Sequence, residues 1–258
     1  MSTAEKGGVT LTRDGHVAVV ETHAPPTGFF DRHLLAAIAD AGERAAADGA
    51  RALVLCAEGR HFCAGVRLTD ATGALDPCAS ATAVHEQAAR ILRLDVPVIA
   101  AVQGAAVGGG LGLACAADFR VAGPSSRFEA DFARRGFPCG FGLSLTLPRI
   151  VGRTRAELLL YTGRPLVGAE ALDAGLADHL AEPGDERAVA LDLAHEIAAT
   201  APLAVRSMRS TMRADLLDGL EAALAREVDE QQRLWRTEDA VAGVTGSVER
   251  RAPVFHGR

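Results

Sequence analysis

The sequence predicts an α/β protein whose C-terminal part is helical. Short apolar segments rich in β-branched side chains are typical of strands, and longer segments with helical periodicity separate them. Beyond about residue 141 only helical patterns occur. Strands that alternate with helices in this way favour a mainly parallel sheet that is buried on both faces. We therefore expect an α/β core over residues 1–190 and a helical region over residues 191–258.

The N-terminal part contains three predicted strands and two predicted helices. The first strand follows the turn signal Arg13-Asp-Gly15, and a Pro-containing segment at residues 23–28 ends it. The second strand is flanked by glycines, and the third directly follows Pro97. The predicted strands are residues 17–22, 52–56 and 98–102, and the predicted helices are residues 31–48 and 81–94.

The C-terminal part is predicted to form a series of amphipathic helices. Apolar residues recur every four positions at Val189, Leu193 and Ile197, and again at positions 216, 220, 224 and 228. Each such stripe must pack against the α/β core or against another subunit. The predicted helices are residues 153–161, 168–174, 186–199, 203–213 and 216–235.

Composition and charge exclude several classes of protein. The 258 residues carry a net charge of −6, which argues against a nucleic-acid-binding protein because phosphate contacts need a basic face. No apolar run approaches the roughly 18 residues that are needed to span a bilayer. The N-terminus lacks the apolar segment of a signal peptide, so we expect a cytoplasmic location.

The cysteines predict neither a disulfide framework nor a zinc site. The chain has 5 of them, an odd number, and no CxxC pair occurs. Cys56 and Cys115 lie in apolar surroundings, where we expect them to pack as small hydrophobic residues. Cys139 lies in a loop rich in glycine and proline, and a nucleophilic role for it is the less favoured alternative.

A cluster of glycines follows the third predicted strand, in the segment AAVGGGLGLAC at residues 105–115. A Walker loop would need a lysine here, and a dinucleotide-binding loop would need glycine in place of Leu113. Two interpretations remain. The glycines allow a strand-to-helix turn to point its amides at an anionic oxygen, or they allow a buried helix to pack closely against the sheet.

A second loop favours the first interpretation. The segment GRHFCAGVRL at residues 59–68 also follows a predicted strand and contains a glycine within a loop. It can therefore supply a second backbone amide. Two amides from two loops make an oxyanion hole, in which each donor contributes about 3–4 kcal/mol in known cases.

These two loops and two further segments together resemble the enoyl-CoA hydratase/isomerase (crotonase) superfamily. The resemblance implies a crotonase-like repeated ββα core with a helical C-terminal region that serves trimerisation and covers CoA. It implies an acyl-CoA substrate, no metal or redox cofactor, and a homotrimer or a dimer of trimers. The matching segments are residues 59–68, 97–110, 147–152 and 171–176, and residues 237–243 and 251–255 are similar to the family's tail.

The resemblance also assigns roles to particular residues. It implies that the amides of Val66 and Gly109 form the oxyanion hole, bind the thioester carbonyl and stabilise its enolate. Arg67 stands where many relatives carry aspartate, and it either pairs with a CoA phosphate or remains solvated. The residues implied to contact CoA are His23, Ala24, His61, Ala64, Arg67, Leu68 and, from a neighbouring subunit's C-terminal segment, Phe255.

The chain departs from the family at the positions that usually carry the catalytic acids. Hydratases of this family use two glutamates, and the matching positions here are Gly112 and Phe132. Other branches use an aspartate at the position of Gly140. Neither glycine nor phenylalanine can transfer a proton. The resemblance therefore supports acyl-CoA binding and enolate stabilisation, and it argues against the usual two-glutamate hydration.

Three nearby residues are candidate substitutes for the missing acids. Asp131 and Glu129 lie next to the Phe132 position, and the alternative for each is a solvated or salt-bridged surface carboxylate. His85 lies where the dehalogenating branch carries a functional histidine, and its alternative is a solvated helix residue. Asp70 is most simply a helix cap.

Three functions follow from these observations. The first is hydration or isomerisation of an enoyl-CoA, with the proton transferred by Asp131, Glu129 or His85. The second is different chemistry on the same fold, namely thioester hydrolysis, dehalogenation or decarboxylation. The third is a non-catalytic acyl-CoA-binding protein.

Overall fold

A seven-stranded sheet forms the centre of the computed structural model, which describes residues 4–6, 8–24, 28–66 and 81–258. Its first three strands pair antiparallel, and the strands from β3 onward pair in parallel. The order across the sheet is β1 (Ala4–Lys6), β2 (Val9–Asp14), β3 (Val17–Thr22), β5 (Ala52–Ala57), β7 (Val98–Val102), β9 (Phe119–Ala122) and β12 (His179–Leu180).

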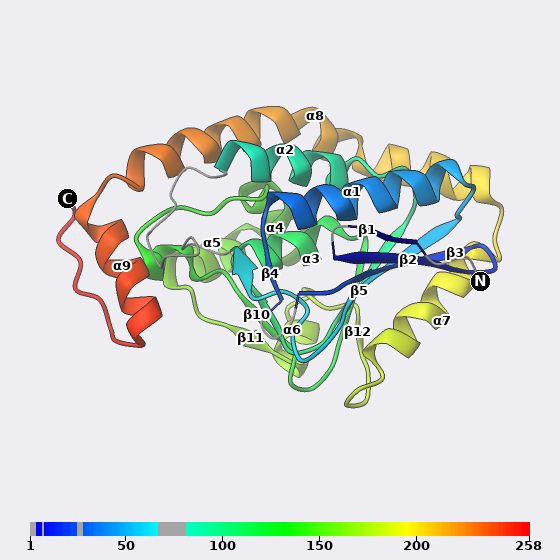
Figure 1. Ribbon diagram of the computed structural model, residues 1–258, viewed down its shortest axis with the longest axis horizontal. Coiled ribbons are helices and arrows are strands. Elements are labelled where there is room, and N and C mark those ends of the chain that lie inside the picture. Colours follow the sequence, from blue (N-terminus) through cyan, green and yellow to red (C-terminus); the bar gives the residue numbers. More distant parts are fainter. Residues whose placement is uncertain (1–3, 7, 25–27, 67–80) are drawn as a thin grey trace.

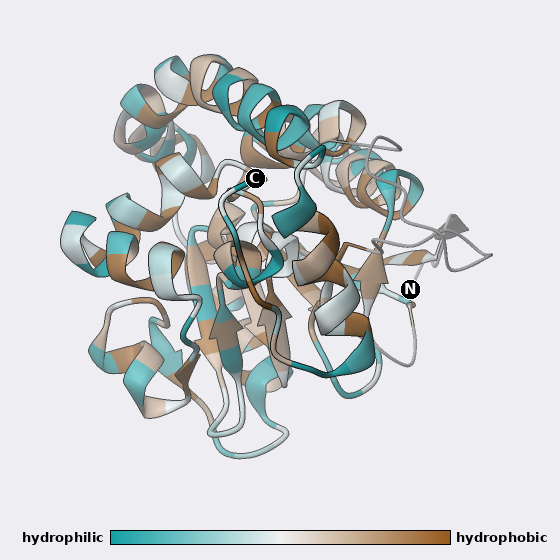
Figure 2. Cartoon of the chain, turned by 90° about the vertical axis from the view of Figure 1, so that its left-hand side faces the viewer, coloured by the Kyte–Doolittle hydropathy of each residue, from teal (hydrophilic) through white to brown (hydrophobic). Residues whose placement is uncertain are grey.

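Alternating side chains bury both faces of this sheet. Val54 and Ile99 face one helix, α7 (Glu186–Ala198), whereas Leu53 and Ala100 face the main core. Strands β5 and β7 are therefore apolar at every position, as a central parallel strand requires. Figure 2 shows apolar residues on the central strands and more hydrophilic residues on the outer helices.

Helices cover the second face of the sheet and extend beyond it. Figure 1 shows the long α8 lying across α2 along the length of the molecule, with α9 and the C-terminus at one end. These helices are α1 (Arg32–Ala47), α2 (Ala81–Leu92), α3 (Gly109–Ala116), α4 (Leu143–Val151), α5 (Arg153–Thr162), α6 (Ala169–Asp173), α8 (Pro202–Leu234) and α9 (Glu238–Glu249).

Two small sheets bring together the segments that the sequence analysis singled out. Strand β8 (Ala105–Val107) pairs with β10 (Arg127–Glu129), which pairs with β11 (Leu166–Val167). Strand β4 (Phe29–Phe30) pairs in parallel with β6 (Gly65–Val66). An isolated β-bridge, a single parallel backbone pairing between Cys63 and Ala106, links the loop before β6 to β8. Both glycine-containing loops therefore lie side by side.

The α/β class and the helical character of the C-terminal part are confirmed. The predicted strands and helices of the N-terminal part lie within a few residues of β3, β5, β7, α1 and α2. The helices predicted at 203–213 and 216–235 are one continuous helix, α8, because the residues between them include neither glycine nor proline.

The predicted apolar stripe of α7 is displaced by one residue. Ala190, Ala194 and Ala198 pack against the sheet, and the larger residues predicted to do so are only partly buried beside them. Small side chains allow the helix to approach the strands closely. The predicted boundary at residue 190 falls inside this helix, and the division into two regions stays a prediction.

No single helix in the described part of the chain is both long enough and apolar enough to cross a membrane. Only α7 and α8 taken together reach the length and hydropathy of a membrane span, and a bend of 108° separates these two helices.

Candidate functional site

A small cavity lies where the two glycine-containing loops meet. Its volume is about 20 Å³, which is room for roughly one water molecule. The two glycine-containing loops form one side of the cavity, and a short 3₁₀ helix, η1 (Asp131–Arg135), forms another. The described residues that line it are Ala64, Gly65, Val66, Val107, Gly108, Gly109, Asp131, Phe132, Arg135 and Phe137.

Backbone hydrogen bonds hold the two loops together. The Cys63 N–H donates to the Ala105 carbonyl at 2.8 Å, and the Val107 N–H donates to the Cys63 carbonyl at 3.0 Å. A Cβ atom on Gly110 would lie only 2.1 Å from the Cys63 carbonyl oxygen. Any larger residue at position 110 would therefore force the loops apart, which explains the third glycine of the cluster.

The turn into α3 brings the first residue of that helix to the cavity. Gly108 has a φ of +57°, which favours glycine, and its N–H donates to the Glu129 carbonyl at 2.8 Å. Gly109 is the first residue of α3, and a first-turn N–H has no acceptor within its own helix. Val66, at the end of β6, lines the same cavity. Two amides from two loops at one cavity can bind one developing oxyanion.

Asp131 places a carboxylate on this cavity. Its Oδ2 atom accepts a hydrogen bond from Arg135 Nε at 2.5 Å. Its Oδ1 atom has no hydrogen bond to a described residue and lies 3.1 Å from the position of a Cβ on Gly108. The side chain is 13% exposed. One carboxylate oxygen of Asp131 is thus held by Arg135, and the other makes no hydrogen bond within the described residues.

Glu129, the second candidate acid, is occupied elsewhere. Its Oε2 atom accepts hydrogen bonds from Arg127, and its Oε1 atom lies 3.6 Å from Arg134 Nη1. The side chain is 8% exposed and does not line the cavity. The structure therefore places Glu129 in a salt-bridge network, as in the alternative weighed for it, but the carboxylate is buried and not on the surface.

His85, the third candidate, lies in a buried polar cluster behind the cavity. Its Nδ1 atom lies 2.5 Å from the Ala81 carbonyl, and its Nε2 atom accepts a hydrogen bond from the Phe141 N–H at 3.2 Å. Nε2 also lies 3.3 Å from Oε2 of Glu227, a residue of α8. His85 is 4% exposed, so it is not the solvated helix residue of the alternative, and it does not line the cavity.

Glu227 was not singled out from the sequence. It accepts hydrogen bonds from the N–H of Gly142 at 2.7 Å and from the N–H and hydroxyl of Ser144. Together with His85 it fixes the loop before α4, where Phe141 has a φ of +62°. A charged residue three positions beyond Leu224, on the apolar stripe of α8, is the sequence signal that points to it.

Aromatic side chains occupy the regions where the family's acids would lie. A Cβ on Gly112 would lie 2.5 Å from the Cβ of Phe141, whose ring packs against Phe30 at 5.8 Å between centroids. Phe132 lines the cavity and makes an edge contact with Phe137 at 6.0 Å. The space at Gly112 is therefore filled by an aromatic residue that sequence reasoning did not identify.

Gly140, the third position of a family acid, faces the buried polar side chains around His85. A Cβ there would lie 2.5 Å from Gln231 Nε2 and 3.1 Å from His85. An aspartate at this position would thus have to displace side chains that are already packed.

Buried thiols do not supply a nucleophile. Burial raises the pKa of each described cysteine from 9.0 to about 12, so each stays protonated near neutral pH. For Cys139 the carboxylate of Glu227 adds to this effect. The described cysteines are Cys56, Cys63, Cys115 and Cys139.

Two of the segments expected to contact CoA meet at Gly28. A Cβ on Gly28 would lie 3.2 Å from the His61 carbonyl oxygen, so Gly28 packs against the loop at 59–66. His61 Nδ1 accepts a hydrogen bond from the Ala105 N–H at 3.1 Å, and burial, with Arg60 nearby, lowers the pKa of His61.

The structure describes three more of the residues expected to contact CoA. His23 lies between Thr10 Oγ1 at 2.7 Å and Glu58 Oε2 at 2.8 Å. Ala24 packs against the main core, and Ala64 lines the cavity. Arg67, Leu68, Asp70 and Cys78 lie outside the described residues.

The C-terminal tail is fixed to α9 of its own chain. Asp239 accepts hydrogen bonds from the N–H groups of His256 at 2.6 Å and Gly257 at 2.8 Å, and these bonds hold the pKa of Asp239 below its usual range. Phe255, on this tail, is 42% exposed. Its expected contact with CoA on a neighbouring subunit stays a prediction.

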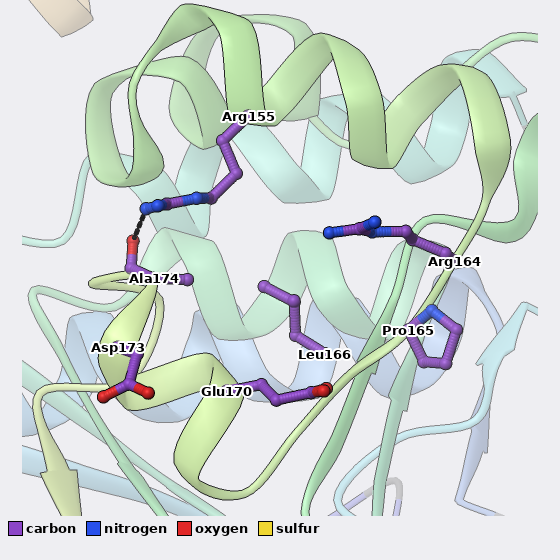
Figure 3. Close-up of a pocket in the computed structure, with 7 residues that line it drawn as sticks. All are labelled: Arg155, Arg164, Pro165, Leu166, Glu170, Asp173 and Ala174. Carbon is purple, nitrogen blue, oxygen red and sulfur yellow. Dashed lines mark hydrogen bonds between the residues drawn. The ribbon is translucent and has the colours of Figure 1, made fainter.

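A larger cavity between α5 and α6 lacks the features of a reaction site. Its volume is about 440 Å³, and Figure 3 shows the guanidinium groups of Arg155 and Arg164 extending into it from opposite sides. Arg155 donates to the Ala174 carbonyl at 2.9 Å, and Glu170 and Asp173 lie on the α6 side. The four charged side chains are exposed, as is usual for a solvated surface. Within the described residues, no cluster of histidine, cysteine or acidic side chains is arranged to hold a metal ion.

Solved structures share the whole architecture of this chain. An enoyl-CoA hydratase from Mycobacterium avium subsp. paratuberculosis K-10 superimposes with a TM-score of 0.86 at 27% identity, covering 96% of this chain and 98% of that one. An enoyl-CoA hydratase/isomerase from Pseudoalteromonas atlantica T6c also gives 0.86, at 29% identity over 96% and 100%. The chain therefore has the crotonase fold.

Sequence comparison identifies the family itself. The model of the enoyl-CoA hydratase/isomerase family matches residues 12–258. A probable enoyl-CoA hydratase of Bacillus subtilis (strain 168) is 32% identical over 256 residues, which cover 96% of this chain and 98% of that protein. The chain belongs to the enoyl-CoA hydratase/isomerase family.

Proposed function

We propose that this chain is an acyl-CoA enzyme that moves the double bond of an enoyl-CoA through a thioester enolate. In this proposal the amides of Val66 and Gly109 bind the thioester oxygen, and Asp131 transfers the proton. The observation that carries it is the free Oδ1 atom of Asp131 on the cavity that both amides line. CoA belongs to the substrate, and the family implies this substrate class.

One carboxylate suffices for this reaction. Asp131 removes the α proton of a 3-enoyl thioester, and the electron pair moves to the thioester oxygen to form a dienolate. Asp131 then returns the proton to the γ carbon, which yields the 2-enoyl thioester. Hydration needs two groups, a base that activates water and an acid that protonates the α carbon. A single carboxylate on the cavity therefore favours isomerisation over hydration.

Arg135 assists by holding Asp131 in place. Its Nε atom binds Oδ2 and leaves Oδ1 directed along the wall that carries Gly108. An anchored side chain loses less conformational freedom when the substrate binds. The N-terminus of α3 adds a favourable field for the oxyanion.

Isomerase assays with a matched pair of variants test this proposal. Asp131→Asn preserves size and removes the base, so conversion of 3-enoyl-CoA to 2-enoyl-CoA is expected to fall by about 10²- to 10⁴-fold. Asp215→Asn is the control. Asp215 also forms an ion pair with an arginine, Arg149, but it lies on α8 and does not line the cavity. Full activity of Asp131→Asn would refute the proposal.

Hydration of a 2-enoyl-CoA is the second candidate, because the relatives named above are called enoyl-CoA hydratases. It requires a second proton-transferring group, which the described cavity lining does not supply. Product analysis separates the two functions, since only hydration yields a 3-hydroxyacyl-CoA. Formation of that product at a rate comparable to isomerisation would favour the second candidate.

We also propose that the chain assembles as a homotrimer or a dimer of trimers. An apolar groove of about 780 Å³ lies between α7 and the first half of α8, and Met212 on its wall is 77% exposed. A groove of this kind is typical of an interface between subunits. Light scattering is expected to give three or six chains, and Met212→Glu to reduce that number. A monomeric wild type would refute the assembly. The expected cytoplasmic location stays a prediction.

A further inference from the structure

Arg135 presents unused hydrogen-bond donors at the candidate site. It lines the cavity, and only its Nε atom is bonded, to Asp131. The two terminal nitrogens of the guanidinium group have no hydrogen-bond partner among the described residues. The side chain is 21% exposed. A guanidinium group has five N–H donors in a fixed plane, so most of its binding capacity is available.

The other arginines of this segment do not share that property. Arg127 and Arg134 both pair with Glu129, and Arg134 also donates to the Thr162 carbonyl. Arg135 needs only its Nε atom to hold Asp131, so this role does not use its two terminal nitrogens. The remaining donors are therefore available to a second anionic partner.

The surroundings strengthen an interaction with an anion at this position. Phe132 and Phe137 line the same cavity, and Phe137 stacks on Trp235 at 4.3 Å between ring centroids. Apolar walls lower the local dielectric constant and make a charge-assisted hydrogen bond stronger than it is in water.

The backbone of Arg135 is held from behind by α9. A Cβ on Gly243 would lie 2.4 Å from the carbonyl carbon of Arg135, and one on Gly136 would lie 2.4 Å from the Asp239 carbonyl oxygen. Helix α9 therefore packs directly on η1 at two glycine contacts. These contacts restrict the backbone of Arg135, and the bond to Asp131 restricts its side chain, so the guanidinium group is partly preorganised for a ligand.

We propose that Arg135 binds a carboxylate on the acyl group, so that the substrate is the CoA monothioester of a short dicarboxylic acid. This inference rests on the proposed function, because it places the thioester oxygen at the amides of Val66 and Gly109. The substrate is then held at two points, its thioester by backbone amides and its distal carboxylate by the terminal nitrogens of Arg135. The Nε atom of Arg135 continues to hold Asp131. The carboxylate of Asp131 and the distal carboxylate of the substrate therefore bind the same guanidinium group.

Binding measurements with two thioesters of equal shape test this inference. Succinyl-CoA carries the distal carboxylate, and 4-methylpentanoyl-CoA replaces it with an isopropyl group of the same outline. Calorimetric titration of the full-length protein is expected to show about 10- to 100-fold tighter binding of succinyl-CoA. Arg135→Met is expected to abolish this preference, so that the two thioesters bind with similar affinity.

Two further variants complete the experiment. Arg135→Lys keeps the positive charge without the planar guanidinium group. It is expected to retain part of the preference for succinyl-CoA. Arg153→Met is the matched control, because Arg153 also binds an acidic residue four positions away through Nε, on the exposed surface of α5.

The outcomes separate this inference from the proposed function. Equal binding of both thioesters by the wild type, or an intact preference in Arg135→Met, would overturn the inference alone. Absence of binding to either thioester would overturn the proposed function and this inference with it. The wild-type comparison decides the matter even where a variant fails to fold.

Discussion

The substitution Gly110→Ala tests whether the close contact between the two loops builds the site. The new Cβ would lie 2.1 Å from the Cys63 carbonyl oxygen, whereas an ordinary contact begins at 3.4 Å. The loops must therefore separate by about 1 Å at the point that sets the spacing of Val66 and Gly109. A displacement of this size costs about 10²-fold in rate when it misplaces reacting groups.

The same change is expected to lower the free energy of unfolding. Overpacking costs about 1–3 kcal/mol, and the better helix propensity of alanine returns up to about 1 kcal/mol. Gly219→Ala is the control, because Gly219 also lies in a helix but its Cβ would make only an ordinary contact, 3.6 Å from Leu145. We expect the control to be slightly more stable than the wild type and fully active.

Urea unfolding and isomerase assays measure both effects. Gly110 does not have a positive φ, so alanine is compatible with its backbone conformation and adds no backbone strain to the effect of the contact. An active Gly110→Ala variant with wild-type stability would show that the loops do not depend on this contact.

Three further predictions concern the surroundings of the cavity. Gly112→Glu is expected to destabilise the protein without creating hydratase activity, because Phe141 fills the space; unfolding and hydration assays check this, and Phe141→Gly in the same chain, which also removes the contacting Cβ, should relieve the strain. Glu227→Ala is expected to cost about 3–5 kcal/mol in urea unfolding, since it leaves the buried polar groups around His85 without their partner. In a Cys78→Ser background, a thiol reagent at pH 8 is expected to label the native protein very slowly, because the pKa of each described cysteine is about 12; rapid labelling before unfolding would contradict this.

The pKa shifts of these thiols also give a direction for stability at high pH. Unfolding returns each thiol pKa to about 9, so above that pH the unfolded chain loses protons that the folded chain keeps. Stability is therefore unaffected by these groups below pH 9 and decreases as the pH rises from about 9 toward 12.

The sequence predicted the fold because the relevant signals are local. The continuous apolar segments of β5 and β7 and the glycine loops are visible within a few positions of the chain. The two helices predicted in place of α8 show the limit of this reasoning, because an apolar stripe does not reveal where one helix continues into the next.

The arrangement of the site depended on contacts that are distant in sequence. Asp131 and Glu129 are only two residues apart, and the chain turns at Ala130, so spacing alone did not reveal which carboxylate reaches the cavity. Phe141 lies against Gly112 from another loop, and Glu227 reaches that loop from α8. No periodicity in the sequence encodes these contacts.

Exchange of the α protons of a saturated thioester tests the central claim most directly. Butyryl-CoA has no double bond to move or hydrate, so its only reaction at this site is reversible formation of the enolate. In D₂O the wild-type protein is expected to incorporate deuterium at the α carbon, and Asp131→Asn is expected to lose this exchange while it still binds the thioester. Exchange by Asp131→Asn at the wild-type rate, or none by a wild-type protein saturated with butyryl-CoA, would contradict the account.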